Sequence, residues 1–489
     1  MTRPSNVIFF FSDNHNAAVM GCAGHPCVQT PTMDRIARDG VRFTNAYCAG
    51  PLCCPSRAAL ATGRYTHQTG TWDNAIVYDG TAPSWMRRIR DQGHEVVSVG
   101  KLHFRATEDD NGFSEERLPM HILNGRGGVH MLLRGFDREP KATGQWELYV
   151  EDSGIGTAHY QDFDENITKS AISWLREEGA TRDQPWVLFV SYPSPHPSFR
   201  IPKRLWDLYP VEDMPLPPQF SPGERPMHPA IEHLRGIMDT QEMTDEDALR
   251  RVAAGYCGLI THVDEQMGAV MDVAEELGLL DTTRIMYSSD HGDLHGAHGL
   301  FGKSCLYDGS VDVPLLMSGP DIPKGRTVEQ VVSHVDLFPT LVEAVGAKLT
   351  DEDADLPGIS LWPATGGDER SRIGFAEYHA AGSKAGSFML RDGNMKLIYH
   401  VGMPSQLFDL DKDPNELRDL IADGSGVETA KRLEAILRTI CDPEDVDARA
   451  KAAQRAKADH WGGLDSILKE GTLVITPPPG IEPDLRPTE

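Results

Sequence analysis

The sequence predicts an α/β protein with a large, mostly parallel central sheet flanked by helices, plus a small C-terminal α+β subdomain. Three observations support this fold class. Short runs rich in Val, Ile and Phe alternate with helical patterns through the first two thirds of the chain. Several of these runs end in polar residues capable of chemistry. From about residue 373 the pattern changes to short strands typical of an antiparallel sheet.

The predicted central sheet begins with four apolar runs that have the composition of buried parallel strands. They lie at residues 6–13, 95–104, 186–196 and 284–293. A helix is predicted over 30–40, because Pro31 stands in its first turn and Gly40 follows its end. A second helix is predicted over 167–179, where apolar residues recur with helical spacing. Strand, helix and strand in alternation predict a doubly wound sheet, and we expect the domain that contains it to span residues 1–372.

The C-terminal subdomain is expected over residues 373–489. Its short strands include a turn at Asp392-Gly393-Asn394, a sequence that favours hairpins. Helices are predicted near 428–440 and 443–463, and the Pro-rich end is expected to be extended.

Composition narrows the range of partners and of cellular locations. The 489 residues carry a net charge of −26, which argues against nucleic acid or an anionic membrane surface as a partner. The apolar run Val7 to Phe11 is too short for a signal-peptide core, and no stretch approaches the roughly 18 apolar residues of a membrane helix. We therefore expect a soluble cytoplasmic protein. A small anionic substrate remains compatible, because it responds to the local field of its pocket.

The ends of the four predicted strands carry residues typical of an active site. In chain order these are Asp13 and Asn14, Lys101 and His103, His196, and Asp290 and His291. Ligands of open parallel sheets bind at the carboxyl ends of the strands. Each residue alone could be a helix cap or a satisfied core histidine, but four such strand ends together favour an active site.

A metal site is predicted from Asp13, Asn14, Asp290 and His291. Their oxygens suit one Ca²⁺, Mg²⁺ or Mn²⁺ ion, and the imidazole shifts the preference slightly toward Mn²⁺ or Zn²⁺. On a continuous helix, His295 could form a two-histidine zinc pair with His291, but Gly292, Gly296 and Gly299 argue against such a helix. We expect His295 and the nearby His298 to be structural or to support the ligands.

Further cationic and proton-donating groups are expected at the same edge of the sheet: Arg57, Lys101, His103, His196 and Lys303. A metal ion within such a ring suits a tetrahedral oxyanion ester, either a phosphate or a sulfate.

Cys53 and Cys54 allow four interpretations: a disulfide, a metal site, a thiolate nucleophile, or a cysteine that is converted into another group. An intracellular location argues against structural disulfides. A zinc site with Cys22, Cys27 and Cys48 would lack the usual Cys-x2-Cys spacing.

The stretch CCPSRAALATGR at 53–64 resembles the type I sulfatase signature Cys-x-Pro-Ser-Arg-x4-Thr-Gly-Arg. The resemblance to this family of the alkaline phosphatase superfamily extends over most of the chain, including 100–104, 195–199, 289–320 and 406–420. It implies that a formylglycine-generating enzyme oxidises Cys53 to Cα-formylglycine before folding. Its hydrate would attack sulfur with one hydroxyl, and deprotonation of the other would then expel sulfate and re-form the aldehyde. Cys54 would be the variable position.

The resemblance also implies roles for individual residues. Asp13, Asn14, Asp290, His291 and the modified Cys53 would hold the metal, usually Ca²⁺ and in some relatives Mn²⁺ or Mg²⁺. Many relatives carry a second Asp where this chain has Asn14. Arg57 and Lys101 would fix the hydrate, and His103 would take the proton that triggers elimination. His196 and Lys303, with Lys101, would bind the sulfate, and His196 and Lys303 would donate to the leaving oxygen. Asn74 matches a pocket residue of choline-sulfatase-like members.

The implied function is hydrolysis of a small organic sulfate monoester, such as an aryl, alkyl, choline-like or sugar sulfate, to an alcohol and inorganic sulfate. The main alternative is a phosphonate or phosphate monoester hydrolase of the same fold, although those relatives tend to replace the Lys-x-His pair at 101 and 103 by Tyr-x-Thr. A two-metal phosphomutase or phosphodiesterase and a sulfate-binding protein without turnover are further alternatives. Resemblance to choline-sulfatase-type members leads us to expect a homo-oligomer, either a dimer or a tetramer.

Overall fold

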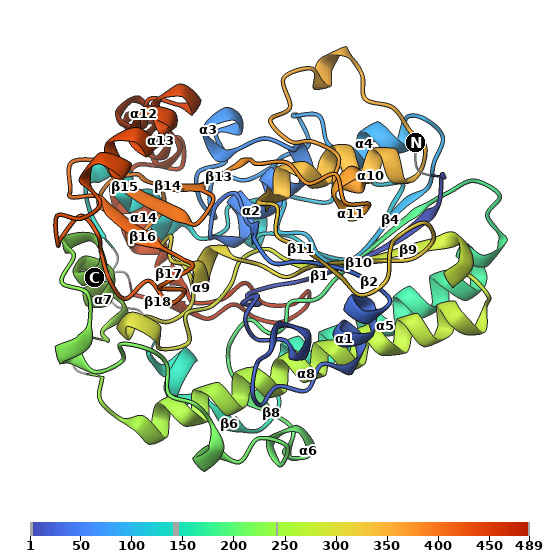
Figure 1. The fold of residues 1–489 in the computed structure, drawn as a ribbon, viewed down its shortest axis with the longest axis horizontal. Coiled ribbons are helices and arrows are strands. Elements are labelled where there is room, and N and C mark those ends of the chain that lie inside the picture. Colours follow the sequence, from blue (N-terminus) through green and yellow to red (C-terminus); the bar gives the residue numbers. More distant parts are fainter. Residues whose placement is uncertain (1–2, 140–145, 241–242, 488–489) are drawn as a thin grey trace.

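The central sheet of the protein has eight strands. The computed structural model describes residues 3–139, 146–240 and 243–487. The strand order is β11-β2-β10-β9-β1-β7-β4-β5, and Figure 1 shows the sheet between two layers of helices. Only β10 runs antiparallel to its neighbours within this sheet. The mostly parallel sheet predicted from sequence is therefore confirmed. Its strands are β1 (Asn6–Ser12), β2 (Gly40–Phe43), β4 (Val96–Lys101), β5 (Glu115–Met120), β7 (Val187–Ser191), β9 (Thr283–Ser289), β10 (Leu315–Ser318) and β11 (Arg326–Val328).

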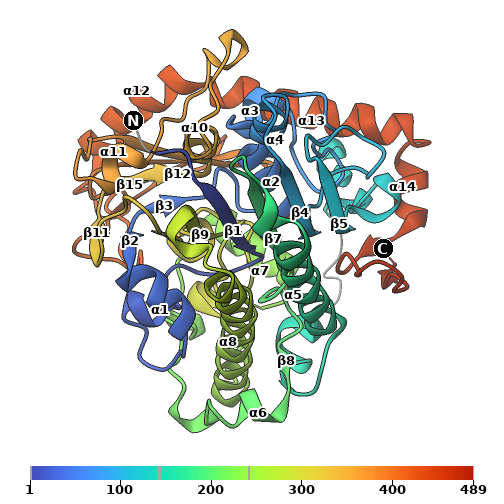
Figure 2. The ribbon, with the colours of Figure 1, turned by 90° about the vertical axis from the view of Figure 1, so that its right-hand side faces the viewer.

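Strand β1 explains why the sheet is covered on both faces. Its side chains alternate between two cores, because successive residues of a strand point to opposite faces. Val7, Phe9 and Phe11 pack in the core that contains helices α2 (Cys53–Thr62), α4 (Trp85–Arg90) and α10 (Leu337–Ala344). Ile8 and Phe10 pack in the core that contains α1 (Pro31–Arg38), α5 (His159–Glu177) and α8 (Glu246–Glu276). Figure 2 shows the two groups of helices on opposite sides of the sheet.

The predicted helices are present, with one notable difference in length. Helix α1 begins at Pro31 as expected. Helix α5 begins already at His159, well before the predicted start at residue 167. The side chain of Gln161 accepts a hydrogen bond from the amide of Ala158 at 2.9 Å, which satisfies a donor at the helix start. This cap stabilises a first turn whose polar composition had not indicated a helix.

A four-stranded antiparallel sheet forms the C-terminal part of the described chain. Its strands are β13 (Ile373–Tyr378), β14 (Ser387–Asp392), β15 (Met395–His400) and β16 (Gln406–Asp409), paired in chain order. The predicted turn at 392–394 joins β14 to β15, and Gly393 has the left-handed φ of 61° that favours glycine. Helices α12 (Val427–Ile440), α13 (Pro443–His460) and α14 (Leu464–Glu470) follow. The domain boundary at 373 stays a prediction.

Buried polar contacts connect the antiparallel sheet to other parts of the chain. The amide of Glu377 in β13 donates to the carbonyl of Ala49, close to the signature at 53–64. Lys396 in β15 is buried and lies 2.6 Å from Asp308 and 2.7 Å from Glu416. The antiparallel sheet is therefore fixed to the part of the chain that carries the predicted active site.

The end of the described chain folds back onto the protein. Strand β17 (Thr472–Leu473) pairs with β18 (Leu485–Arg486), and the Pro-rich segment lies between them. Among the described residues, none of the helices has the length and hydropathy that a membrane span requires.

Candidate active site

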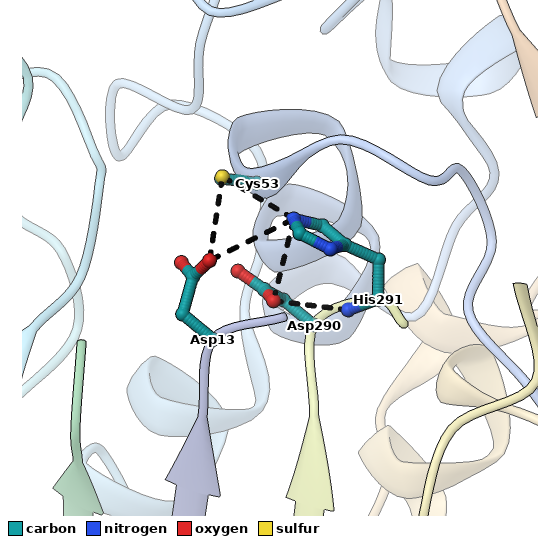
Figure 3. A group of neighbouring side chains, drawn as sticks. All are labelled: Asp13, Cys53, Asp290 and His291. Carbon is teal, nitrogen blue, oxygen red and sulfur yellow. Dashed lines mark hydrogen bonds and ion pairs between the residues drawn. The ribbon is translucent and has the colours of Figure 1, made fainter. Parts of the chain in front are cut away.

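The ends of β1 and β9 bring four ligand-type side chains together. Asp13 follows β1, and Asp290 and His291 follow β9, the strand paired with β1. With Cys53 from α2 they offer donor atoms that all lie within 4.8 Å of one another, and all four residues are buried. His291 Nε2 lies 3.8 Å from Asp13 Oδ1 and 3.3 Å from Cys53 Sγ. Figure 3 shows the four side chains pointing toward one centre.

Helix α2 supplies Cys53 and Arg57 from one face. Cys53 is the first residue of the helix, and Arg57 follows one turn later, so both side chains reach the same neighbours. Arg57 Nε donates to Asp290 Oδ2 at 2.8 Å, and its Nη2 donates to Asp13 Oδ2 at 3.1 Å. Residue 53 thus stands at the positive end of a helix, beside an arginine bound to both carboxylates.

The remaining signature residues fix this helix in place. Pro55 lies in the first turn, where a missing amide proton costs nothing. The hydroxyl of Ser56 donates to the carbonyl of Asp290. Gly63 ends the helix with a left-handed φ of 64°, and a Cβ there would lie only 2.8 Å from the Cβ of Phe338. The signature therefore encodes a buried helix of fixed position.

Lys101 reaches the carboxylate of Asp13 from the end of β4. The pairing of β4 with β5 shifts register between Val99 and Lys101, and Gly100 between them has a left-handed φ of 103°. A Cβ at Gly100 would lie 2.3 Å from the carbonyl oxygen of Ser191. This irregularity redirects the chain. Lys101 Nζ lies 2.6 Å from Asp13 Oδ2, with both side chains fully buried.

The two carboxylates differ in their electrostatic environment. Burial opposes ionisation of Asp13, but the nearby charges of Lys101 and Arg57 hold its pKa well below the usual range. Burial and the negative charge of Asp13 raise the pKa of Asp290 to about 7, although Arg57 acts against this shift. Two buried carboxylates this close favour the binding of a further cation.

The residues present fit a divalent metal ion. An ion with ligands at 2.3–2.6 Å has donors separated by at most about 5 Å, which agrees with the 4.8 Å limit of this cluster. His291 Nδ1 lies 3.1 Å from the carbonyl oxygen of Gly292, which can only accept, so the lone pair of Nε2 is free for a metal. The amide nitrogen of Asn14 donates to Asp293, and Asn14 Oδ1 has no hydrogen-bond partner in the described chain. Such an oxygen suits a hard cation.

Cys53 as an unmodified cysteine is poorly suited to act as a nucleophile. Its side chain is 2% exposed. Burial and the charge of Asp13 raise the pKa of the Cys53 thiol to about 11, although Lys303 and Lys101 act against this shift. The thiol is therefore neutral near pH 7, whereas the reactive form of cysteine is the thiolate.

A pocket of 150 Å³ opens above Cys53. The predicted residues Asn74, Lys101, His103, His196 and Lys303 all contribute to its lining. Asn74 Oδ1 accepts a hydrogen bond from the amide of Cys54 at 3.1 Å, so this side chain is fixed beside residue 53. The structure thus brings together all the residues that the sequence analysis selected.

Two histidines of the pocket differ in their hydrogen bonds. His103 is 4% exposed, and neither ring nitrogen has a hydrogen-bond partner among the described residues. Burial, together with the charges of Lys101 and Arg57, holds the pKa of His103 well below its usual value. His196 Nδ1 lies 3.1 Å from the carbonyl of Pro197, so that nitrogen carries the proton and Nε2 can accept one. Both rings are therefore neutral bases in the free protein.

The sequence analysis missed some residues that line the pocket, because no motif marks them. They include His130, Tyr149, Tyr160, Phe301 and the segment 473–476. The buried His130 follows Gly128, whose amide donates to the carbonyl of Asn74. The ring of His295 stacks on that of Tyr256 at 5.2 Å, and the ring of His298 lies tilted against that of Tyr307 at 4.4 Å. The structural role expected for these two histidines stays a prediction.

Comparisons with known proteins agree with this geometry. The family described as "Sulfatase" matches residues 5–347, and the family "N-sulphoglucosamine sulphohydrolase, C-terminal" matches residues 296–442. The choline-sulfatase of Rhizobium meliloti is 30% identical over 474 residues, covering 94% of this chain and 91% of that protein. Arylsulfatase K of Gallus gallus is 29% identical over 486 residues, covering 94% and 86%.

Solved structures share the fold. The phosphonate monoester hydrolase of Agrobacterium radiobacter has a TM-score of 0.70 at 23% identity, covering 99% of both chains. A protein bound to its substrate D-glucosamine-2-N,6-O-disulfate has a TM-score of 0.70 at 23% identity, covering 92% of this chain and 99% of that one.

Fold and site together define an α/β protein that shares its fold with a phosphonate monoester hydrolase and has a buried cluster of ligand-type side chains at the carboxyl edge of its sheet. More narrowly, the chain belongs to the sulfatase family. It is an enzyme of the sulfuric ester hydrolase class, as the sequence analysis predicted.

Proposed function

We propose that this enzyme hydrolyses a small organic sulfate monoester to an alcohol and inorganic sulfate, using Cα-formylglycine formed from Cys53 and one divalent metal ion. The supporting observation is the position of Cys53. Its sulfur lies 3.3 Å from His291 Nε2 and 3.8 Å from Asp13 Oδ1, within the ligand cluster and below the pocket. A neutral, buried thiol has no evident use there, whereas a group with two hydroxyls on one carbon could both attack sulfur and release sulfate.

The metal ligands would be Asp13, Asn14, Asp290 and His291, together with the modified residue 53. Their oxygen-rich set favours Ca²⁺, with Mn²⁺ and Mg²⁺ as alternatives. When bound, the ion would lower the cost of the negative charge that develops on the sulfate oxygens.

The basic residues would divide the remaining work. Arg57 and Lys101 would fix the side chain of residue 53, because both already contact Asp13 beside it. His103, with two free ring nitrogens, would accept the proton whose loss triggers release of sulfate. His196 and Lys303 would bind the sulfate and donate a proton to the leaving oxygen. An anionic ester would favour the protonated form of His196 Nε2.

A phosphonate monoester hydrolase is the second candidate, and the likeness in fold to the Agrobacterium radiobacter enzyme favours it. The Lys-x-His pair at 101 and 103 favours sulfate instead, because the resemblance to phosphonate hydrolases would lead one to expect Tyr and Thr at these positions.

Mass spectrometry of the peptide that contains residue 53, from protein made in its native host, tests the modification. We expect the mass of an aldehyde or its hydrate at Cys53, with Cys54 unchanged. Rates on an aryl sulfate and on a phenylphosphonate ester then distinguish the two reactions. An intact thiol at 53 in fully active protein would contradict the mechanism, and faster hydrolysis of the phosphonate would favour the second candidate.

A further inference from the structure

The walls of the pocket above the sulfate-binding groups are mainly apolar. Three separate parts of the chain supply them. Leu234, Ile237 and Met238 come from α7 (Pro229–Met238), and Leu148 and Tyr149 come from η4 (Glu147–Glu151). Leu473, Val474 and Ile475 come from β17 and the residues that follow it.

The wall at 473–476 is anchored, so its apolar side chains are a fixed part of the pocket. Leu473 pairs with Leu485 in the β17–β18 ladder. The hydroxyl of Tyr160 donates to the carbonyl of Thr476 at 2.6 Å. A second cavity of 440 Å³ also contacts Val474 and Ile475, so this segment separates two spaces. The wall therefore limits the length of the group that the active-site pocket can take.

The formally charged side chains that line the pocket are all cationic. Lys101 and Lys303 line it, whereas none of its described lining residues is Asp or Glu. The nearby Glu139 already accepts from the amide of Gly382 at 3.0 Å and lies 3.4 Å from His233. Lys101 and Lys303 are expected to hold the sulfate, and a cationic alcohol would find no carboxylate to pair with among the described lining residues.

The aromatic side chains of the pocket do not form an open cage for a cation. The rings of Tyr149 and Phe301 stack on each other at 5.6 Å. The ring of Tyr160 faces Lys101 Nζ at 5.7 Å and has its edge contact with His196 at 5.8 Å. These aromatic surfaces are engaged by other groups of the protein, which leaves them less available to a quaternary ammonium ligand.

We propose that the alcohol part of the substrate is uncharged, compact and apolar, and that it lies against Ile237 of α7 and Ile475 of the wall. This inference rests on the proposed function and specifies its substrate class. The pocket volume of 150 Å³ has to hold the sulfate group as well, so we expect only a compact alcohol part, such as one ring or a short branched alkyl group, to lie inside it. The Rhizobium meliloti relative is named choline-sulfatase. For the present enzyme, this proposal excludes choline O-sulfate as the preferred substrate.

The test compares choline O-sulfate with 3,3-dimethylbutyl sulfate, which has the same shape but carries carbon in place of the charged nitrogen. We expect kcat/KM for the uncharged ester to exceed that for choline O-sulfate at least about tenfold. Equal or faster hydrolysis of choline O-sulfate would overturn the inference.

Paired variants locate the alcohol. Ile237 and Ile475 are half-buried, so a polar side chain is tolerated there better than in the core. Ile237→Glu and Ile475→Glu should each reduce the preference for the uncharged ester at least about tenfold, while the matched Ile237→Gln and Ile475→Gln change it less than about threefold. Melting temperatures show which variants fold. An unchanged preference in both folded Glu variants would contradict the placement of the alcohol.

The same two alcohols are also tested as phenylphosphonate monoesters. Hydrolysis of these esters but not of the sulfates would contradict the proposed function. A preference for the charged alcohol in either ester series would overturn the inference about the alcohol and leave the proposed function standing.

Discussion

Arg57 and Asp290 form a fully buried ion pair, with Arg57 Nε donating to Asp290 Oδ2 at 2.8 Å. The same guanidinium contacts Asp13 and the carbonyl of Lys101, so one side chain joins α2 to the ends of β1, β4 and β9. The position of residue 53 is thereby coupled to that of the candidate metal ligands.

Arg57→Lys should therefore impair both activity and stability. A lysine cannot reproduce the fork that bonds two carboxylates at once. We expect the free energy of unfolding to fall by about 3 kcal/mol and kcat/KM to fall at least about 100-fold. Urea titration and steady-state kinetics measure the two effects. Arg64→Lys is the matched control, because Arg64 ends the same signature but pairs with Asp355, which is largely exposed. Wild-type rates in Arg57→Lys would refute the coupling.

The two adjacent cysteines should respond very differently to substitution. Cys53→Ala should lower steady-state turnover at least about 1,000-fold, because the nucleophile is lost. Cys54→Ala should stay within about tenfold of the wild-type rate, because the contact of residue 54 with Asn74 is made by its backbone amide. The measurement is hydrolysis of an aryl sulfate, with circular dichroism to verify folding. Comparable losses in both variants would argue against a unique role for residue 53.

Removal of the metal should abolish activity. Asp13→Asn replaces a carboxylate that contacts Lys101, Arg57 and the ligand cluster, and elemental analysis should show a large loss of bound divalent ion. In the wild-type enzyme, dialysis against a chelator should remove activity, and re-addition of Ca²⁺, Mn²⁺ and Mg²⁺ should identify the ion that restores it. Full turnover by protein shown to be free of metal would exclude the proposed role of the cluster.

Acid stability should depend on Glu377, a residue outside the pocket. Glu377 Oε1 lies 2.9 Å from His67 Nδ1, and Oε2 lies 2.9 Å from His379 Nε2. Burial opposes ionisation, but these hydrogen bonds and charges lower the pKa of Glu377 to about 2. A depressed folded-state pKa contributes stability above the unfolded-state pKa of about 4.3, and this stability is lost as the pH falls toward 2.

Glu377→Gln should accordingly cost up to about 3 kcal/mol of unfolding free energy at pH 7, and the difference from the wild type should shrink steadily between about pH 5 and pH 2. Chemical denaturation across this range gives the measurement. A difference that is constant with pH would assign the effect of the substitution to packing instead of ionisation.

The strand ends of the active site were predictable because their signal is local. Asp13, Lys101 and Asp290 each follow an apolar run, and the geometry of parallel strands brings such ends together. Asn74 lacks this context, and only the resemblance to sulfatases indicated it. The reversed direction of β10 was not predicted, because a short buried strand has the same composition in either orientation.

The apolar walls of the pocket could not be predicted for a different reason. The segment 473–476 is separated by hundreds of residues from the strand ends that it faces, and its sequence resembles that of many short strands. Tertiary packing alone brings it to Tyr160 and Leu148. The residues that determine the reaction were therefore more accessible from sequence than those expected to determine the substrate.

The contact between Cys53 and His291 has a consequence for biosynthesis. The two residues are 238 positions apart in the chain, and ribosomes add about 5–20 residues per second. For roughly 12 to 48 s after residue 53 is added, the groups from β9 that enclose its thiol do not yet exist. An enzyme that modifies Cys53, as proposed above, would thus have a window during translation before His291 can enclose the thiol, and slower synthesis between residues 53 and 291 would lengthen it.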